Sequence, residues 1–92
     1  MPSKDHSRYR VFWTRHAITE ALEDGFRTGE IEAAFSGLVE IPGFDEAKTR
    51  GVARVGGRYC TAIFMKMKAG IRIITCWASS PADIDDYKRL SK

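Results

Sequence analysis

Residue types that build metal sites and disulfide frameworks are scarce in this sequence. It holds two cysteines and two histidines, and Cys60 and Cys76 lack the CxxC spacing typical of structural zinc sites. Both cysteines fall within segments that we expect to be strands. Burial as small apolar side chains is the leading interpretation, and a disulfide between neighbouring strands is the alternative. We therefore expect a protein without a metal or another cofactor.

Long apolar runs are absent too. No stretch approaches the ~18 residues of a membrane span, and the opening MPSKDHSRYR lacks the apolar middle of a secretory signal. These absences predict a cytoplasmic protein without a membrane partner. With 92 residues, the chain should form a single domain over 1–92, with residues 1–8 as a flexible lead-in. So short a chain has one modest core, and its functional site must therefore be an open cleft or a sheet face.

Compensating acids are missing from one part of the sequence. Residues 48–72 contain seven Lys or Arg and no acid, whereas residues 17–47 contain eight acids and one Arg. The small net charge of +3 hides this pattern. It predicts acidic helices and a basic sheet.

Periodicity predicts a strand and two helices in the first half. Tyr9–Trp13 is rich in β-branched and aromatic residues, which is typical of a short strand. A helix capped by Thr14 should follow, and Gly25 should end it. Thr28 can cap a second helix. The apolar stripes would be Ala17, Ile18, Ala21 and Leu22 on the first helix, and Ile31, Ala34, Phe35 and Leu38 on the second.

The period changes to that of strands after EIPGFDEAK, which reads as a loop. Three strands are predicted, at Val52–Val55, Tyr59–Met67 and Ile71–Trp77. Short turns link them, so they should pair antiparallel. SSPADIDDYKRL predicts a last helix capped by Ser80. The fold class is therefore α+β, with two N-terminal helices, a three- to four-stranded antiparallel sheet and a C-terminal helix, in the order β-α-α-β-β-β-α.

Basic residues of the sheet segment are the first candidates for a site. Arg50 and Arg54 should share one face of a strand because side chains alternate. A tight turn at Gly56–Gly57 would place Arg54 opposite Tyr59. Guanidinium groups match phosphate oxygens, which favours a phosphate-binding surface. A solvated face that resists edge-to-edge aggregation is the alternative. The full basic set is Arg50, Arg54, Arg58, Lys66, Lys68 and Arg72.

Histidine and tyrosine are the second candidates. His16 would lie in the first turn of the first helix, where the dipole favours a neutral imidazole that can act as a base. An ordinary surface histidine is the alternative. Tyr87 shares one side of the last helix with Ile84, so packing competes with a functional role. Further candidates for contact with nucleic acid are Tyr59, Trp77, Lys88 and Arg89.

The available groups suit RNA chemistry. No P-loop, GxGxxG, zincin helix or serine elbow is present. The 2′-hydroxyl of RNA is an internal nucleophile that requires alignment, a proton acceptor and charge stabilisation, without a metal.

Two stretches also resemble a known group. GFRTGEIEAAFSG and GGRYCTAIFMKMKAGIRIITCWASSPADIDDYKR resemble the BrnT group of the RelE/ParE-like toxin superfamily. In that group a two-helix start leads to a Gly-Arg strand, a strand much like IRIITCW and a C-terminal helix containing a Tyr. The matching positions here are Gly57–Arg58, Ile71–Thr75 and Tyr87. RHAITEAL also resembles the helix opening of a related uncharacterised small family.

The resemblance implies a RelE-like fold, cleavage of mRNA, including mRNA on the ribosome, and a cognate antitoxin protein. Two hypotheses follow, and a homodimer stays open in both. The first is a metal-independent endoribonuclease toxin, with the catalytic set His16, Arg58, Arg72 and Tyr87. The second is a non-catalytic module on the same fold that binds protein or nucleic acid. CWASS and the acidic last helix, where the toxin pattern has basic residues, favour the second. The residues expected to contact RNA are Arg50, Arg54, Tyr59, Lys66, Lys68, Lys88 and Arg89.

Overall fold

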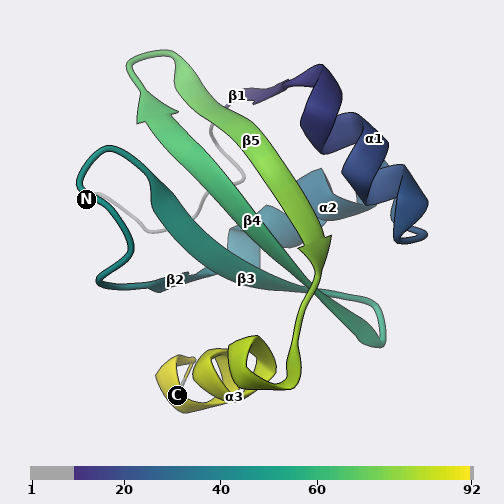
Figure 1. The fold of residues 1–92 in the computed structure, drawn as a ribbon, viewed down its shortest axis with the longest axis vertical. Coiled ribbons are helices and arrows are strands. Elements are labelled where there is room, and N and C mark those ends of the chain that lie inside the picture. The colour runs from purple at the N-terminus through teal and green to yellow at the C-terminus, as the bar shows by residue number, and fades with distance from the viewer. Residues whose placement is uncertain (1–9, 92) are drawn as a thin grey trace.

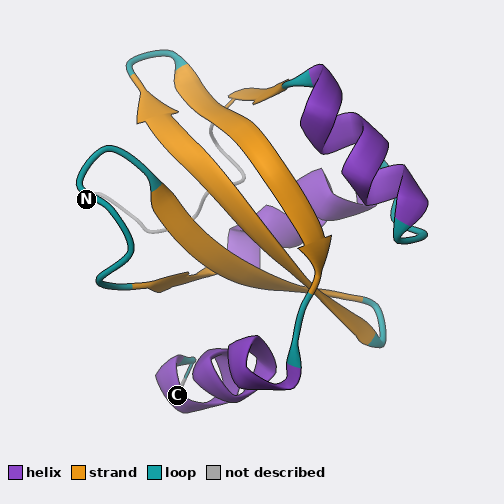
Figure 2. Cartoon of the chain, in the orientation of Figure 1, coloured by secondary structure: helices purple, strands orange, loops and turns teal. Residues whose placement is uncertain are grey.

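A computed structural model describes residues 10–91 of the chain. Three helices surround one five-stranded sheet of order β1-β5-β4-β3-β2. Helices α1 and α2 lie on one face of the sheet and α3 crosses the other (Figure 1). The connections between the elements are short (Figure 2). The bounds are β1 (Arg10–Trp13), α1 (Arg15–Glu23), α2 (Thr28–Ala34), the 3-10 turn η2 (Phe35–Gly37), β2 (Val39–Ile41), β3 (Thr49–Val55), β4 (Arg58–Met67), β5 (Gly70–Ala78) and α3 (Pro81–Leu90). The expected flexibility of residues 1–8 concerns a part of the chain outside this description.

The α+β class is confirmed, but the predicted sheet was wrong in strand number and direction. Val39–Ile41, within and just before the expected loop, is a strand antiparallel to β3. A strand of three residues followed by Pro42 is too short to give a periodic signal in the sequence. The observed order is therefore β-α-α-β-β-β-β-α.

Strand β1 makes the sheet mixed, because it runs parallel to β5 with Arg10 opposite Gly70. A Cβ on Gly70 would lie 2.1 Å from the Arg10 carbonyl oxygen. Only glycine therefore lets the two backbones approach this closely. Sequence periodicity does not report such a contact between segments far apart in the chain.

Side-chain alternation assigns each residue of the central strands to a face. The predicted register of the hairpin is confirmed, with Arg54 opposite Tyr59 and Arg58 opposite Val55. Arg50 and Arg54 therefore share one face, which is the face that α3 crosses. Thr61 occupies this face too, opposite Val52 of β3 and Trp77 of β5.

The main core lies between the sheet and the helices α1 and α2. Phe35 and Phe64 meet edge to face at its centre, with ring centroids 5.7 Å apart. The predicted stripe of α1 was half wrong. Ala17 and Ala21 are fully buried, whereas Ile18 and Leu22 are 37% and 59% exposed.

Two further details of the helices correct the sequence analysis. Thr28 is the first residue of α2 rather than its cap; Arg27 occupies the cap position and its backbone N donates to Glu30 Oε1 at 3.1 Å. The α-helix also ends at Ala34, because the next three residues tighten into η2.

Polar side chains of α1 close the exposed edge of β5 beyond the end of β1. The backbone N of Ala78 donates to Asp24 Oδ2 at 2.7 Å. Thr75 Oγ1 donates to Glu20, and Cys76 Sγ donates to the Ala17 carbonyl at 3.6 Å. The Ala78 contact satisfies a backbone donor that would otherwise be open to pairing with another chain, and the two side-chain contacts hold α1 against β5.

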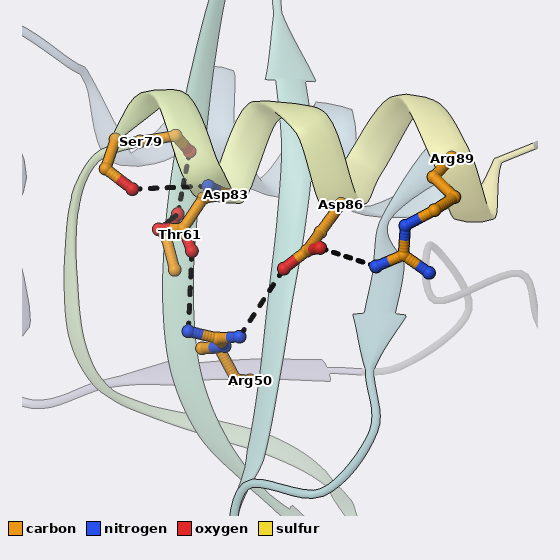
Figure 3. Close-up of polar contacts among 7 residues, drawn as sticks. Arg50, Thr61, Ser79, Asp83, Asp86 and Arg89 are labelled. Atoms are coloured by element: carbon orange, nitrogen blue, oxygen red, sulfur yellow. Dashed lines mark hydrogen bonds and ion pairs between the residues drawn. The ribbon is translucent and has the colours of Figure 1, made fainter.

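A buried carboxylate attaches α3 to the other face (Figure 3). Asp83 is 5% exposed, accepts a hydrogen bond from Thr61 Oγ1 at 2.8 Å and pairs with Arg50 Nη1 at 3.4 Å. Asp86, one turn further along, contacts Arg50 Nη2 at 3.7 Å. Ser79 Oγ lies 2.7 Å from Thr61 Oγ1 at the start of the helix. The charge of Asp83 is therefore paired and hydrogen-bonded, as burial requires.

Asp83→Ala should lower the free energy of unfolding by about 2–4 kcal/mol, because it removes the buried carboxylate that Arg50 and Thr61 share. Urea unfolding followed by circular dichroism measures this. Asp85→Ala is the matched control, because it removes the same charge from an exposed position of α3 and should change stability by less than about 0.5 kcal/mol. Equal effects of the two substitutions would show that the Asp83 contacts do not hold the helix.

Candidate nucleic-acid interface

Helix α3 covers only part of its face of the sheet. It contacts β2 and β3 and crosses the end of the sheet where β5 stops (Figure 1). The opposite corner, made by β1, the start of β5 and the end of β4, has no described helix over it (Figure 1). The sheet therefore has a covered half and an open half on this face.

An aromatic ring and two arginines occupy the open half. Phe12 lies opposite Arg72, and Arg72 lies opposite Met65, so these three side chains form a row across β1, β5 and β4. The Arg10 guanidinium lies 5.4 Å from the centroid of the Phe12 ring. Phe12 and Met65 are half-buried, and both arginines are exposed. The basic–aromatic face, as we call it, consists of Arg10, Phe12, Met65, Met67 and Arg72.

Within the described part of the chain, the cations of the basic–aromatic face form no ion pair with a carboxylate. No carboxylate of residues 10–91 forms an ion pair with Arg10, Arg72 or with Lys68 in the adjoining turn. This surface can therefore offer guanidinium groups to phosphate and a half-exposed ring to an unpaired base.

Other cations expected to contact RNA are already paired. Arg50 lies between Asp83 and Asp86, and its buried Nε has no hydrogen-bond partner. Lys66 contacts Glu40 at 2.8 Å on the opposite face, and Arg89 contacts Asp86 at 2.6 Å. Lys88 is exposed in the last turn of α3.

The residues proposed as a catalytic set do not converge. His16 is exposed on α1, with its Nε2 3.4 Å from Glu20 Oε1. Arg58 stacks on Phe26, on the face of the sheet that carries α1 and α2. Arg72 lies on the other face, opposite a residue of β4 seven positions beyond Arg58, or about 23 Å along the strand.

Tyr87, the fourth member, packs edge to face against Tyr59, with centroids 5.1 Å apart and an interplanar angle of 64°. This contact joins α3 to the start of β4. Both rings therefore have a packing role in the covered half, at the end of the sheet away from Arg72. Arg54 lies on the same face near the hairpin, and its Nε donates to the Gly56 carbonyl at 3.0 Å.

Arg72 is the one member of the basic–aromatic face that carried a functional expectation in the sequence; Arg10 and Phe12, which supply its second cation and its ring, carried none. Their alternation within RVFW was a usable signal for a strand with Arg and Phe on one side. What was missing was the parallel pairing with β5, which places them beside Arg72.

Residues 10–91 were searched for groups that could bind a metal ion or act as a nucleophile. No group of three or more His, Cys, Asp or Glu is placed there to hold a metal ion. Cys60 and Cys76 are free thiols, both buried. A hydrogen bond with Cys76, together with burial, raises the pKa of the Cys60 thiol well above its usual value.

No helix of the described part is long and apolar enough to cross a membrane.

Comparison with protein-family models, with curated proteins and with solved structures found no match to this chain. We therefore infer function from the chain's own residues and their geometry.

The two thiols should resist modification in the folded protein, because both are buried and a reagent cannot reach them. Reaction with a disulfide reagent at neutral pH, followed by absorbance, should be at least about a hundredfold slower than in urea, since it requires opening of the fold. The reaction in urea is the control, because both cysteines should react there and give the full change in absorbance. Rapid modification of the native protein would contradict the burial of this pair.

Proposed function

We propose that this protein is a non-catalytic module that binds single-stranded nucleic acid through the basic–aromatic face, with RNA as the ligand that the family resemblance implies. The observation that carries the proposal is the position of Phe12, half-buried between Arg10 and Arg72 on a part of the sheet that no helix of residues 10–91 covers. An unpaired base can stack on such a ring, while the arginines bind the flanking phosphates.

A single strand fits this surface better than a duplex. The base faces of a duplex are hidden within its own stack, so a ring on an open sheet gains nothing from it. A single strand exposes those faces, and each stacked base contributes about 1–3 kcal/mol. The row of Phe12, Arg72 and Met65 also crosses three adjacent strands, which gives a single strand a continuous line of contacts.

The geometry supports binding over cleavage. An endoribonuclease of the expected kind would need His16, Arg58 and Arg72 around a single phosphate. Arg58 and Arg72 lie on opposite faces of the sheet, and Tyr87 is packed against Tyr59. The toxin assignment, with its antitoxin partner and cleavage of mRNA, stays a hypothesis from resemblance.

Substitutions on the basic–aromatic face should weaken RNA binding without unfolding the protein. Fluorescence anisotropy with a labelled single-stranded RNA of about ten nucleotides measures the affinity. Phe12→Leu keeps an apolar side chain but removes the ring, and should weaken binding by about fivefold to a hundredfold. Arg72→Ala should weaken binding and reduce the slope of log affinity against log salt by about 0.7.

Arg27→Ala is the matched control, because Arg27 is an exposed arginine at the start of α2, on the other side of the sheet. It should leave the affinity nearly unchanged. Equal losses of RNA affinity for Arg27→Ala and Arg72→Ala would indicate diffuse electrostatic attraction and would contradict the proposed site. If incubation with the wild-type protein shortens the RNA, and incubation with His16→Ala leaves it intact, the result would instead support the endoribonuclease. Tighter binding to an acidic peptide than to RNA would favour a protein partner.

A further inference from the structure

A second candidate site lies at the other end of the molecule, on the face that carries α1 and α2. A cleft of about 450 Å³ opens between the turn that joins these helices and the hairpin that joins β3 and β4. Its volume falls within the range of small-molecule sites. The residues that give the cleft its chemistry are Phe26, Glu30, Ala34, Arg54, Val55 and Arg58.

The Arg58 guanidinium is held flat in this cleft. Its carbon lies 3.9 Å from the centroid of the Phe26 ring. Its Nη1 donates to the Gly25 carbonyl at 3.5 Å, and its Nη2 donates to the Asp24 carbonyl. One face of the guanidinium is thus occupied by the ring, and the opposite face is available to a ligand.

Gly25 makes this arrangement possible. Its φ of +83° is strained for other residues, and a Cβ there would lie 3.1 Å from Arg58 Nη1. The backbone therefore approaches the guanidinium more closely than a side chain would allow. Contacts with two carbonyls and a ring fix the plane of Arg58 before a ligand arrives, which lowers the entropy cost of binding. A planar guanidinium of this kind is a stacking surface for a nucleobase.

Two charged side chains complete the rim of the cleft. Arg54 belongs to the strand face that α3 crosses, but it stands beside the hairpin, where it also lines the mouth of the cleft. Its Nε donates to the Gly56 carbonyl at 3.0 Å, which orients the side chain and leaves its terminal nitrogens for an anion. Glu30 uses Oε1 to accept from the Arg27 backbone N at 3.1 Å, which leaves Oε2 to accept from a ligand amine. Two guanidinium groups against one carboxylate make the rim suitable for a ligand with an anion and a planar donor.

We propose that this cleft binds a purine nucleoside monophosphate, either free or as the phosphorylated end of an RNA chain. The base stacks on the outer face of Arg58, the phosphate pairs with Arg54, and the exocyclic amine donates to Glu30. Phe26 supports the inner face of Arg58, and Val55 borders the cleft beside it. This site shares no residue with the basic–aromatic face, so it does not depend on the function proposed above.

Isothermal titration calorimetry of the whole protein with AMP, at millimolar concentration and low salt, tests this site. Arg54→Ala should weaken AMP binding about tenfold or more, because a charge-assisted contact is lost. Adenosine, which lacks the phosphate, should bind wild-type protein more weakly by a similar factor. Arg58→Lys keeps the charge but removes the planar guanidinium, and should also weaken AMP binding about tenfold. Circular dichroism confirms that each variant is folded.

Arg72→Ala and Phe12→Leu are the controls, because both lie on the other face and should leave AMP binding unchanged. A failure here is therefore separable from a failure of RNA binding. A 5′-phosphorylated RNA that competes with AMP more strongly than its unphosphorylated twin identifies the chain end as the source. Equal competition by the two RNAs assigns the cleft to the free nucleotide. Absence of heat with millimolar AMP, equal binding of AMP and adenosine, or insensitivity to both Arg54→Ala and Arg58→Lys would overturn the proposal.

Discussion

The buried carboxylate of Asp83 is the contact on which the exposed surface of this protein depends. It joins α3 to the sheet through Thr61 and Arg50, and both partners come from the strands beneath it. A charge so deeply buried costs several kcal/mol unless it is paired, so α3 has one favourable position on the sheet. That position decides which basic residues are covered and which remain available. The acids of α3 neutralise Arg50 at one end, while Arg72 at the other end is left to solvent.

The sorting of charge along the sequence thus has two different outcomes in space. Part of the basic sheet is matched internally, since Glu40 pairs with Lys66 and α3 pairs with Arg50. The rest is exposed at two separate places, the basic–aromatic face and the cleft beside Arg58. A simple count of cations would merge these surfaces. Their separation by the thickness and length of the sheet is what argues against a single catalytic centre.

Local features of the fold were predictable from the sequence, and long-range features were not. The hairpin register followed from Gly56–Gly57 and alternation, and Thr14 caps α1 as expected. Strand β2 was missed because three residues carry no period. The parallel pairing of β1 depends on Gly70 and joins two strands that α1, α2, β2, β3 and β4 separate along the chain, which local patterns do not encode. The predicted sheet, with three to four antiparallel strands, was therefore one or two strands short and lacked the parallel pair.

The same distinction applies to the candidate sites. Arg72 and Arg58 were identifiable as basic residues without nearby acids, but their separation required the strand register. Phe12 was visible as part of a strand and became a candidate only beside Arg72. The pairing of Arg50 with Asp83 was hidden, because the two residues belong to segments with separate local patterns. Side-chain partners across a fold depend on tertiary position, which a single sequence does not specify.

The most direct test of the account is a map of where a single-stranded RNA touches the protein. Backbone amide shifts of isotope-labelled protein, recorded by nuclear magnetic resonance during titration, provide that map. We expect the largest changes in Arg10–Trp13, at the end of β4 and in the first residues of β5, with little change in the strands beneath α3. Changes centred on α3 and Arg50, or on the outer side of α1, would contradict the claim that the position of α3 leaves the nucleic-acid surface at the opposite corner of the sheet.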